Sequence, residues 1–199
     1  MIGAIVLAAG RSRRFGGDKR RHVLPSGLSM LATTTRLFQQ VFPAIRVVVS
    51  PRDEDLLSTL GITLRPADKL IIAADADLGM GHSLAAGASD LHWDQTFVGL
   101  ADMPYVKPET LNEMIARAQL LSPDEVLVPV FQGKRGHPVC FGATHLPNLC
   151  TLTGDQGARA ILGSKQPILI DVNDEGILLD LDQPPPNRVA QSSLDRHEP

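Results

Sequence analysis

The sequence predicts an α/β protein built on a mainly parallel sheet. Short β-branched runs alternate with segments whose apolar residues have helical spacing, which is the pattern of strand–helix–strand units. The first run, residues 2–9, is apolar at consecutive rather than alternate positions, as in a parallel strand that is buried on both faces. Because no repeat or linker interrupts residues 1–182, we expect them to form one domain.

The elements follow one another along the chain. We predict strands at residues 2–9, 45–49, 70–73, 96–100, 126–131, 139–141, 168–172 and 177–181. We predict helices at residues 30–41, 53–60, 83–91, 108–121 and 158–162. Residues 183–199 contain three consecutive prolines and many polar residues, and we expect them to form a loose C-terminal tail.

Composition narrows the class of protein. A chain of 199 residues with 43% hydrophobic and 21% charged residues can bury a sizeable core. The formal net charge of -3 argues against general nucleic-acid binding. No apolar stretch has the length of a membrane span, and residues 2–9 are too short for a secretory signal. Two cysteines, Cys140 and Cys150, give no disulfide framework, so we expect a cytoplasmic protein.

A glycine-rich, basic loop follows the first predicted strand. Gly10, Gly16 and Gly17 let backbone amides approach an anion closely, since no Cβ intervenes. Six of the eleven residues 11–21 are arginine or lysine, which supply charge and hydrogen-bond donors that fit phosphate. The loop matches neither the P-loop nor the dinucleotide fingerprint. It predicts a phosphate cradle, and a basic surface loop or a nucleic-acid patch is the alternative.

Carboxylates at two predicted strand ends are candidates for a metal site. Asp102 directly follows the strand at residues 96–100, at the edge where α/β sheets bind ligands. Asp180 and Asp182 have period-two spacing at the end of the last predicted strand and would share a face. Because Mg²⁺ needs only one or two carboxylates besides substrate phosphates, Asp102 and Asp182 form a candidate pair. A turn before Pro104 and a solvated strand end are the alternatives.

Two further turns carry candidate ligands. Residues 79–83 place glycines and Ser83 at a helix start, a shape suited to an anion or a ribose, although Ser83 also suits a simple N-cap. His137 lies on a turn between Gly136 and Pro138, where a ligand contact and a merely solvated histidine are both open. The histidines and cysteines lack the spacing of a zinc site.

Together these motifs match a known family. The order Leu7-Ala8-Ala9-Gly10-x-Ser12-x-Arg14-Phe15-Gly16-x-x-Lys19 resembles the signature of the nucleotidyltransferase superfamily, which makes sugar nucleotides and nucleotide-linked molybdenum cofactors. Four later blocks resemble its molybdenum cofactor cytidylyltransferase branch. They are residues 79–87, 101–104, 135–139 and 154–159. The resemblance extends from residue 1 to about residue 182.

The resemblance implies a Rossmann-like three-layer sandwich and a Mg²⁺-dependent transfer of a nucleotidyl group, with release of pyrophosphate. The substrates would be a nucleoside triphosphate and a phosphorylated acceptor, with a molybdoenzyme as a further partner. Arg14, Lys19 and Asp102 would be catalytic, and Asp102 and Asp182 would hold the metal. The expected nucleotide-binding residues are Leu7, Ala8, Ala9, Gly10, Gly16, Gly81 and Ser83. His137 would contact the acceptor.

The chain also departs from the branch. Arg20, Arg21 and His22 stand where apolar residues usually follow the lysine, and Gln183 replaces the usual threonine. Ala9 is the alanine common in cytidylyl members, where guanylyl members often have glycine. A non-catalytic binding partner in molybdoenzyme maturation and a sugar-1-phosphate nucleotidyltransferase remain as alternative hypotheses. A dehydrogenase is disfavoured, because the dinucleotide fingerprint is missing.

Overall fold

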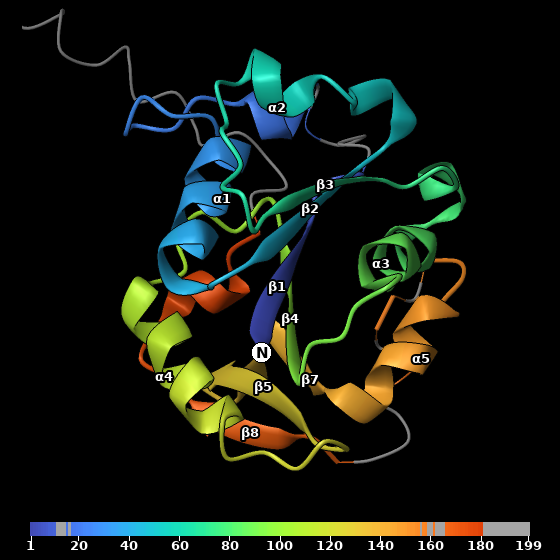
Figure 1. The fold of residues 1–199 in the computed structure, drawn as a ribbon. Helices are drawn as coiled ribbons and strands as arrows, with labels where there is room; N and C mark the ends of the chain where they lie inside the picture. The colour runs from blue at the N-terminus through green and yellow to red at the C-terminus, as the bar shows by residue number, and fades with distance from the viewer. Residues whose placement is uncertain (11–14, 16, 156, 159–160, 162–165, 181–199) are drawn as a thin grey trace, which may run out of the picture.

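The computed structural model describes residues 1–10, 15, 17–155, 157–158, 161 and 166–180. Within these residues an eight-stranded sheet lies between two helical layers, with α1 and α4 on one face and α3 and α5 on the other (Figure 1). The strands are β1 (Ile2–Leu7), β2 (Ile45–Val49), β3 (Lys69–Ile72), β4 (Gln95–Leu100), β5 (Val126–Phe131), β6 (Lys134–Arg135), β7 (Val139–Gly142) and β8 (Ile168–Asp171). This arrangement confirms the predicted three-layer α/β sandwich.

The helices are short and fill the connections between strands. The α-helices are α1 (Met30–Val41), α2 (Leu56–Thr59), α3 (Met80–Ala88), α4 (Pro108–Ala118) and α5 (Leu146–Cys150). The 3₁₀ turns are η1 (Lys19–Arg21), η2 (Pro51–Asp53), η3 (Ala76–Leu78), η4 (Ala143–His145) and η5 (Glu175–Leu178).

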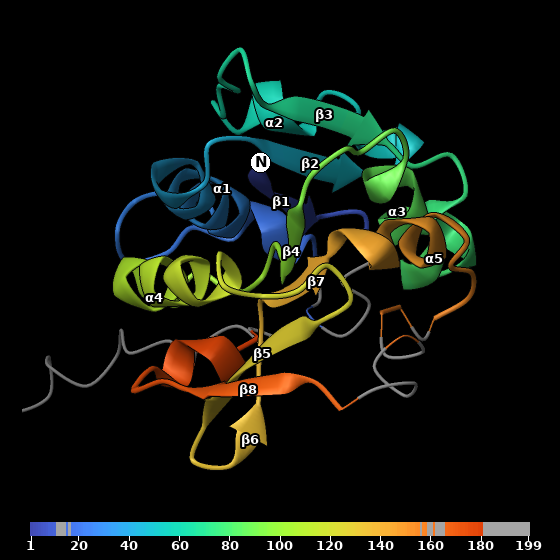
Figure 2. The ribbon, with the colours of Figure 1, turned by 60° about the horizontal axis from the view of Figure 1, so that its bottom comes forward.

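The sheet is mainly parallel, with one strand reversed in its middle. The strand order is β3-β2-β1-β4-β7-β5-β6, and β8 pairs with β5. Among the strands of the described residues, β3, β2, β1 and β4 pair in parallel, as do β5 and β8. β7 pairs antiparallel with both β4 and β5, so β5 and β8 again run in the direction of β4 (Figure 2). All the long parallel strands therefore end at one edge of the sheet.

The central strand β1 explains the apolar run that opens the sequence. Ala4 and Val6 face the core under α1 and α4, where Phe38 and Met114 are buried. Ile5 and Leu7 face the second core, under α3 and α5, where Leu84 is buried. Because both faces are covered by helices, alternate positions of β1 are equally apolar.

The predicted elements vary in accuracy. The bounds of α1, β2 and β5 are those predicted, and Ser29 caps α1 by accepting a hydrogen bond from the Ala32 amide. The predicted helix at residues 53–60 is instead η2 followed by the one-turn α2.

The predicted strand at residues 177–181 is wrong, because residues 175–178 form η5. The buried carboxylate of Asp174 caps that turn by accepting a hydrogen bond from the Gly176 amide. The predicted helix at residues 158–162, the tail and the domain boundary at 182 lie largely outside the described residues.

A buried arginine holds the C-terminus of α3. Arg46 of β2 donates hydrogen bonds to the carbonyls of Gly87, at 3.0 Å, and Ser89, just where α3 ends. Its guanidinium also lies over the ring of Trp93, 5.8 Å from the ring centroid. A cation at a helix C-terminus is favourable because the unpaired carbonyls there carry partial negative charge. Holding the C-terminus of α3 against β2 places its N-terminus at the edge where the parallel strands end.

A second arginine clamps the segment that leads into β3. Arg65 donates a paired hydrogen bond to the Asp68 carboxylate, from Nε at 2.9 Å and from Nη2 at 2.8 Å. Asp68 also accepts from the Gln39 side chain and the Ile45 amide. Burial alone would raise the pKa of Asp68, but these hydrogen bonds outweigh it and lower the pKa to about 2.

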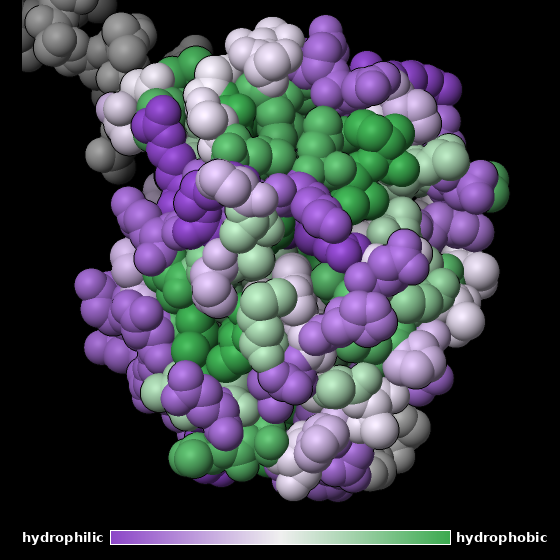
Figure 3. Space-filling view, viewed as in Figure 1, coloured by the Kyte–Doolittle hydropathy of each residue, from purple (hydrophilic) through white to green (hydrophobic). Residues whose placement is uncertain are grey.

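Helices α1 and α4 present polar outer faces. Figure 3 shows mainly hydrophilic side chains on the outside of α1 and α4, at the left margin of the view. None of the helices in the described residues is long and apolar enough to cross a membrane.

The Asp68 clamp predicts an acid-sensitive component of stability. The folded pKa lies below the unfolded value, so the ionised carboxylate stabilises the fold above about pH 4, and this contribution is lost as pH falls toward 2. We expect Asp68→Asn to lower the unfolding free energy by roughly 2 kcal/mol at pH 7 and by much less at pH 2. Urea unfolding from pH 2 to pH 7 measures both values. Parallel stability curves for the two proteins would contradict the assignment.

Candidate active site

The register of two central strands brings two predicted motifs together. β1 and β4 pair in parallel with Leu7 opposite Leu100, so the loops that follow them leave the sheet side by side. The Ala101 amide donates to the Leu7 carbonyl at 3.1 Å, and the Ala8 amide donates to the Val48 carbonyl at 2.8 Å. The start of the glycine-rich loop and Asp102 therefore share one edge of the sheet, as the sequence predicts for a ligand site.

A cavity of about 390 Å³ opens at this edge. Its walls come from the loop after β1, from η1, from the segment that begins α3 and from the loop after β4. Seven of the predicted site residues line it: Leu7, Ala8, Ala9, Gly10, Lys19, Ser83 and Asp102. A second cavity of about 350 Å³ adjoins it, and Ala9, Gly10, Arg20 and Asp77 line both. The volume of the first suits a small-molecule ligand.

The two predicted catalytic groups of the described residues meet in this cavity. Lys19 Nζ donates to Asp102 Oδ2, across 83 positions of sequence. Their side chains are 17% and 14% exposed, so both are largely desolvated yet reach the cavity surface. A carboxylate oxygen in this position can ligate a hard cation, and the ammonium group can contact phosphate oxygens.

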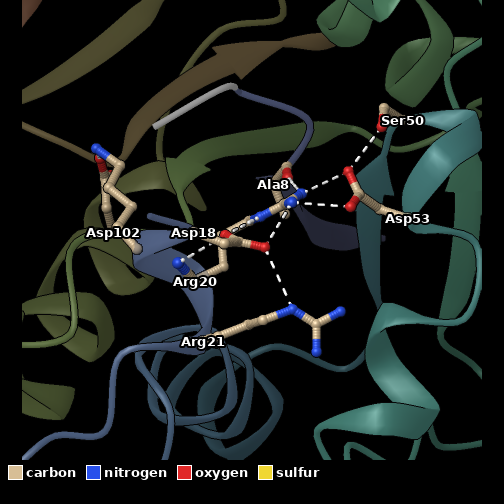
Figure 4. Close-up of polar contacts among 8 residues, drawn as sticks. Ala8, Asp18, Arg20, Arg21, Ser50, Asp53 and Asp102 are labelled. Carbon is tan, nitrogen blue, oxygen red and sulfur yellow. Dashed lines mark hydrogen bonds and ion pairs between the residues drawn. The ribbon is translucent and has the colours of Figure 1, made fainter. Parts of the chain in front are cut away.

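Arg20 is the best-connected side chain near the site (Figure 4). Its guanidinium donates from Nε and Nη2 to Asp18, at 2.7 and 2.8 Å, and from Nη1 and Nη2 to Asp53, at 2.8 and 2.9 Å. Nη1 also donates to the Ala8 carbonyl at 2.7 Å, and Ser50 donates to Asp53 at 2.6 Å. Burial alone would lower the pKa of Arg20, but the hydrogen bonds that it donates to the two carboxylates outweigh burial and raise it. The pKa of Asp53 is lowered, because Arg20 and Ser50 together outweigh its burial.

Backbone contact between two glycine segments builds the opposite wall. Gly79 has a φ of +129°, and a Cβ there would strike the Gly154 carbonyl. The Gly81 amide donates to the Gly154 carbonyl at 2.8 Å, and a Cβ on Gly81 would lie 2.6 Å from the Thr153 carbonyl oxygen. This contact brings Asp155 into the cavity lining beside Gly79.

The remaining predicted site residues lie elsewhere or outside the described residues. Gly81 packs against residues 153–154 and is not among the described residues that line the cavity. His137 precedes β7, at the carboxyl end of β4, and its amide donates to the Ile177 carbonyl at 3.0 Å. It too is absent from the described lining of this cavity. Arg14, Gly16 and Asp182 lie outside the described residues, so their predicted roles stay predictions.

Sequence reasoning missed three contributors to the site. Arg20 belongs to a run of basic residues that is typical of a solvated loop, and its acceptors Ala8 and Asp53 are distant in sequence. Asp155 belongs to a motif that the family resemblance identified without a role. Asp77 follows the predicted strand at residues 70–73 and belongs to none of the motifs that the sequence offers. For Arg20, the nearby signal was Asp18, a carboxylate two residues away.

Comparison with known proteins identifies relatives along most of the chain. Residues 4–168 match the family model of the MobA-like NTP transferase domain. The purine catabolism protein PucB of Bacillus subtilis is 31% identical over 192 residues, which cover 90% of this chain and 91% of that protein. A probable molybdenum cofactor guanylyltransferase of Natranaerobius thermophilus is 26% identical over 132 residues, which cover 66% of this chain and 62% of that protein.

A solved structure shares the fold. The manganese complex of Rv0371c from Mycobacterium tuberculosis superposes with a TM-score of 0.67 and 22% identity, covering 86% of each chain.

The contact between Gly79 and Gly154 predicts a substitution-sensitive wall. We expect Gly79→Ala to displace the wall formed by residues 153–155 and to weaken ligand binding in the cavity, because φ is unfavourable and the space is filled. Gly61→Ala is the matched control: its φ is +63°, but nothing lies within 4 Å of the added methyl group. It should cost about 1 kcal/mol of stability and leave binding unchanged. Calorimetric titration with nucleotide measures the difference. Equal binding by both variants would contradict the role of this wall.

Proposed function

Because the chain belongs to the MobA-like NTP transferase domain family and is a nucleotidyltransferase, we propose that it transfers CMP from CTP to a phosphorylated acceptor of the molybdopterin type, releasing pyrophosphate. One observation carries the proposal. Lys19 and Asp102 meet in a cavity that is also lined by Ala8, Ala9 and Gly10 of the segment leaving β1, so a cation and a candidate cation ligand lie beside that segment. Those are the groups that transfer of a phosphoryl-type centre requires.

A magnesium ion fits the donor chemistry of this cavity. Asp102 supplies a carboxylate oxygen, the ligand type that Mg²⁺ prefers, and we propose that Asp182 supplies a second. Within the described residues no group of three or more His, Cys, Asp or Glu side chains is arranged around a metal position. Mg²⁺ is commonly held by one or two carboxylates together with water and substrate phosphates, and this donor set is of that kind. When bound, the ion would polarise the α-phosphate and neutralise charge on the leaving group.

The described charges of the cavity support binding of a metal–nucleotide complex rather than a bare triphosphate. Its described lining holds two cationic side chains, Lys19 and Arg20, and three carboxylates, Asp77, Asp102 and Asp155. Such a wall does not by itself neutralise a triphosphate. A divalent cation would therefore be needed for nucleotide binding and not only for the chemical step.

The protein's own groups would act mainly by position and charge. Backbone amides at Ala9 and Gly10 would face the phosphates, and Lys19 would leave Asp102 to cover the departing pyrophosphate oxygens. Arg14 is proposed to share that charge. A phosphorylated acceptor already carries an oxyanion, so the reaction needs no general base from the protein.

Ala9 supports cytidine as the base, and one relative supports guanosine. Ala9 lines both cavities, and we propose that it borders the region into which the nucleobase extends. The Natranaerobius relative is named a guanylyltransferase, which makes GTP the second candidate. The same name supports a molybdenum cofactor as acceptor. The Bacillus subtilis relative is named a purine catabolism protein, a name that specifies neither a nucleotide nor an acceptor. We propose His137 as a contact for the acceptor and a molybdoenzyme as a further partner.

Substitutions of Lys19 and Asp102 test the roles proposed for these two side chains. We expect Asp102→Asn to reduce Mg²⁺-dependent pyrophosphate release at least about 100-fold, because it removes the cation ligand and keeps the shape. Lys19→Met should slow release and weaken nucleotide binding. Asp55→Asn, an exposed aspartate on the same protein, is the matched control and should behave as wild type. Pyrophosphate release with CTP, Mg²⁺ and molybdopterin measures the effect. Normal turnover by Asp102→Asn would remove Asp102 from the mechanism.

The second prediction concerns nucleotide choice. Thermal unfolding with CTP, GTP, UTP or ATP, each with and without Mg²⁺, should show a selective Mg²⁺-dependent shift with CTP; saturation at about a hundred times Kd contributes about 2.7 kcal/mol. Ala9→Gly should move the preference toward GTP by roughly tenfold, since it removes a methyl group at the cavity wall. A wild-type shift with GTP alone would change the assigned nucleotide. Absence of a shift with every triphosphate would contradict nucleotidyl transfer by this cavity.

A further inference from the structure

Arg20 has no donor left for a substrate. A guanidinium has five N–H groups, and the five hydrogen bonds to Asp18, Asp53 and the Ala8 carbonyl engage Nε and both terminal nitrogens. The residue is also buried, at 9% exposure, although it reaches the walls of both cavities. An arginine that binds phosphate would instead present a free pair of donors.

Charge leads to the same conclusion. The carboxylates of Asp18 and Asp53 balance the positive charges of Arg20 and of Arg21, whose Nε lies 3.4 Å from Asp18, so the cluster carries no net positive charge. Such a cluster does not attract a triphosphate. Its hydrogen bonds join the η1 turn to the end of β1 through Ala8 and to η2, the turn that follows β2, through Asp53. The cluster therefore ties three segments of chain together beside the cavity.

Because Lys19 and Arg20 are neighbours in η1, fixing the Arg20 side chain also fixes the direction of the Lys19 side chain. Lys19 and Arg20 are consecutive in a 3₁₀ turn, where successive side chains point about 120° apart around the axis. Asp18 caps the turn, accepting from the Arg20 amide at 3.1 Å as well as from its side chain. With Arg20 held toward Asp53, Lys19 is directed to the other side of the turn, where it meets Asp102.

We propose that Arg20 is a positioning residue that holds Lys19 in register with Asp102, by clamping η1 to the ends of β1 and β2. This inference rests on the proposed function and adds to it the residue that positions Lys19 for the reaction. Lysine at position 20 could not replace the arginine, because an ammonium group has three donors and no planar fork to satisfy two carboxylates at once.

The first experiment compares two arginine clamps. Arg20→Lys should lower kcat for pyrophosphate release roughly 10- to 100-fold, because a small displacement of Lys19 disturbs the reacting geometry. Arg65→Lys is the matched control: Arg65 grips Asp68 with the same paired geometry, but neither residue lines the described cavities. It should reduce thermal stability and leave kcat unchanged. Full kcat in Arg20→Lys, or an equal loss in Arg65→Lys, would overturn the proposal.

A double-mutant cycle tests whether Arg20 acts through Lys19. If it does, Lys19→Met combined with Arg20→Lys should be no slower than Lys19→Met alone, and the two effects should not add. The same cycle is measured on the Kd for CTP with Mg²⁺, by calorimetry. Additive effects in both cycles would show that Arg20 acts independently of Lys19, and would overturn the proposal.

A second variant, Asp53→Asn, and a crystal structure of either variant test the role of Arg20 separately from turnover by Arg20→Lys. If Arg20→Lys fails to fold, Asp53→Asn loosens one side of the clamp and should lower kcat in the same non-additive way with Lys19→Met. A crystal structure of either variant in which Lys19 still meets Asp102 would overturn the positioning role without any assay of turnover. Wild-type protein that binds CTP but releases no pyrophosphate with any phosphorylated acceptor would defeat the proposed function. The binding cycle and the crystal structure would still decide the role of Arg20.

Discussion

The parallel pairing of β1 with β4 is the constraint on which the site depends. It aligns Leu7 with Leu100, so two loops that are far apart in sequence leave the sheet next to each other. The cavity, the Lys19–Asp102 contact and the position of the η1 turn all follow from that alignment. A shift of one residue in this register would turn the side chains of β1 to the wrong layers and separate the two loops.

Strong local signals made much of the fold predictable. α1 was predicted with its bounds because the spacing of its apolar residues is a local feature of the sequence. The parallel core strands were predictable because strands buried on both faces are apolar throughout. Residues 177–181 look like a strand for the same reason. The turn there depends instead on Asp174 and on Gly176, where a Cβ would strike the Tyr105 carbonyl, and neither constraint is visible in periodicity.

The candidate site was predictable where a motif carries its own chemistry. Seven predicted residues line one cavity: six lie at the end of β1 or after β1 and β4, which are neighbours in the sheet, and Ser83 lies in α3. Arg20 was not predictable, because its role is defined by acceptors contributed by β1 and η2. A basic run in a sequence is typical of a solvated face. Burial and complete donor saturation, which only the tertiary structure provides, distinguish a structural clamp from a binding group.

The place of β1 in the strand order has a consequence for chain synthesis. During translation β1 can pair on one side with β2, about 40 residues later, but its other edge must wait for β4, about 90 residues later. Throughout that interval a strand that is apolar on both faces has an unpaired edge, the kind of surface that recruits other strands. The nascent segment that contains β1 is therefore exposed to aggregation until β4 is available. Shielding by a chaperone would matter most before residue 100 leaves the ribosome.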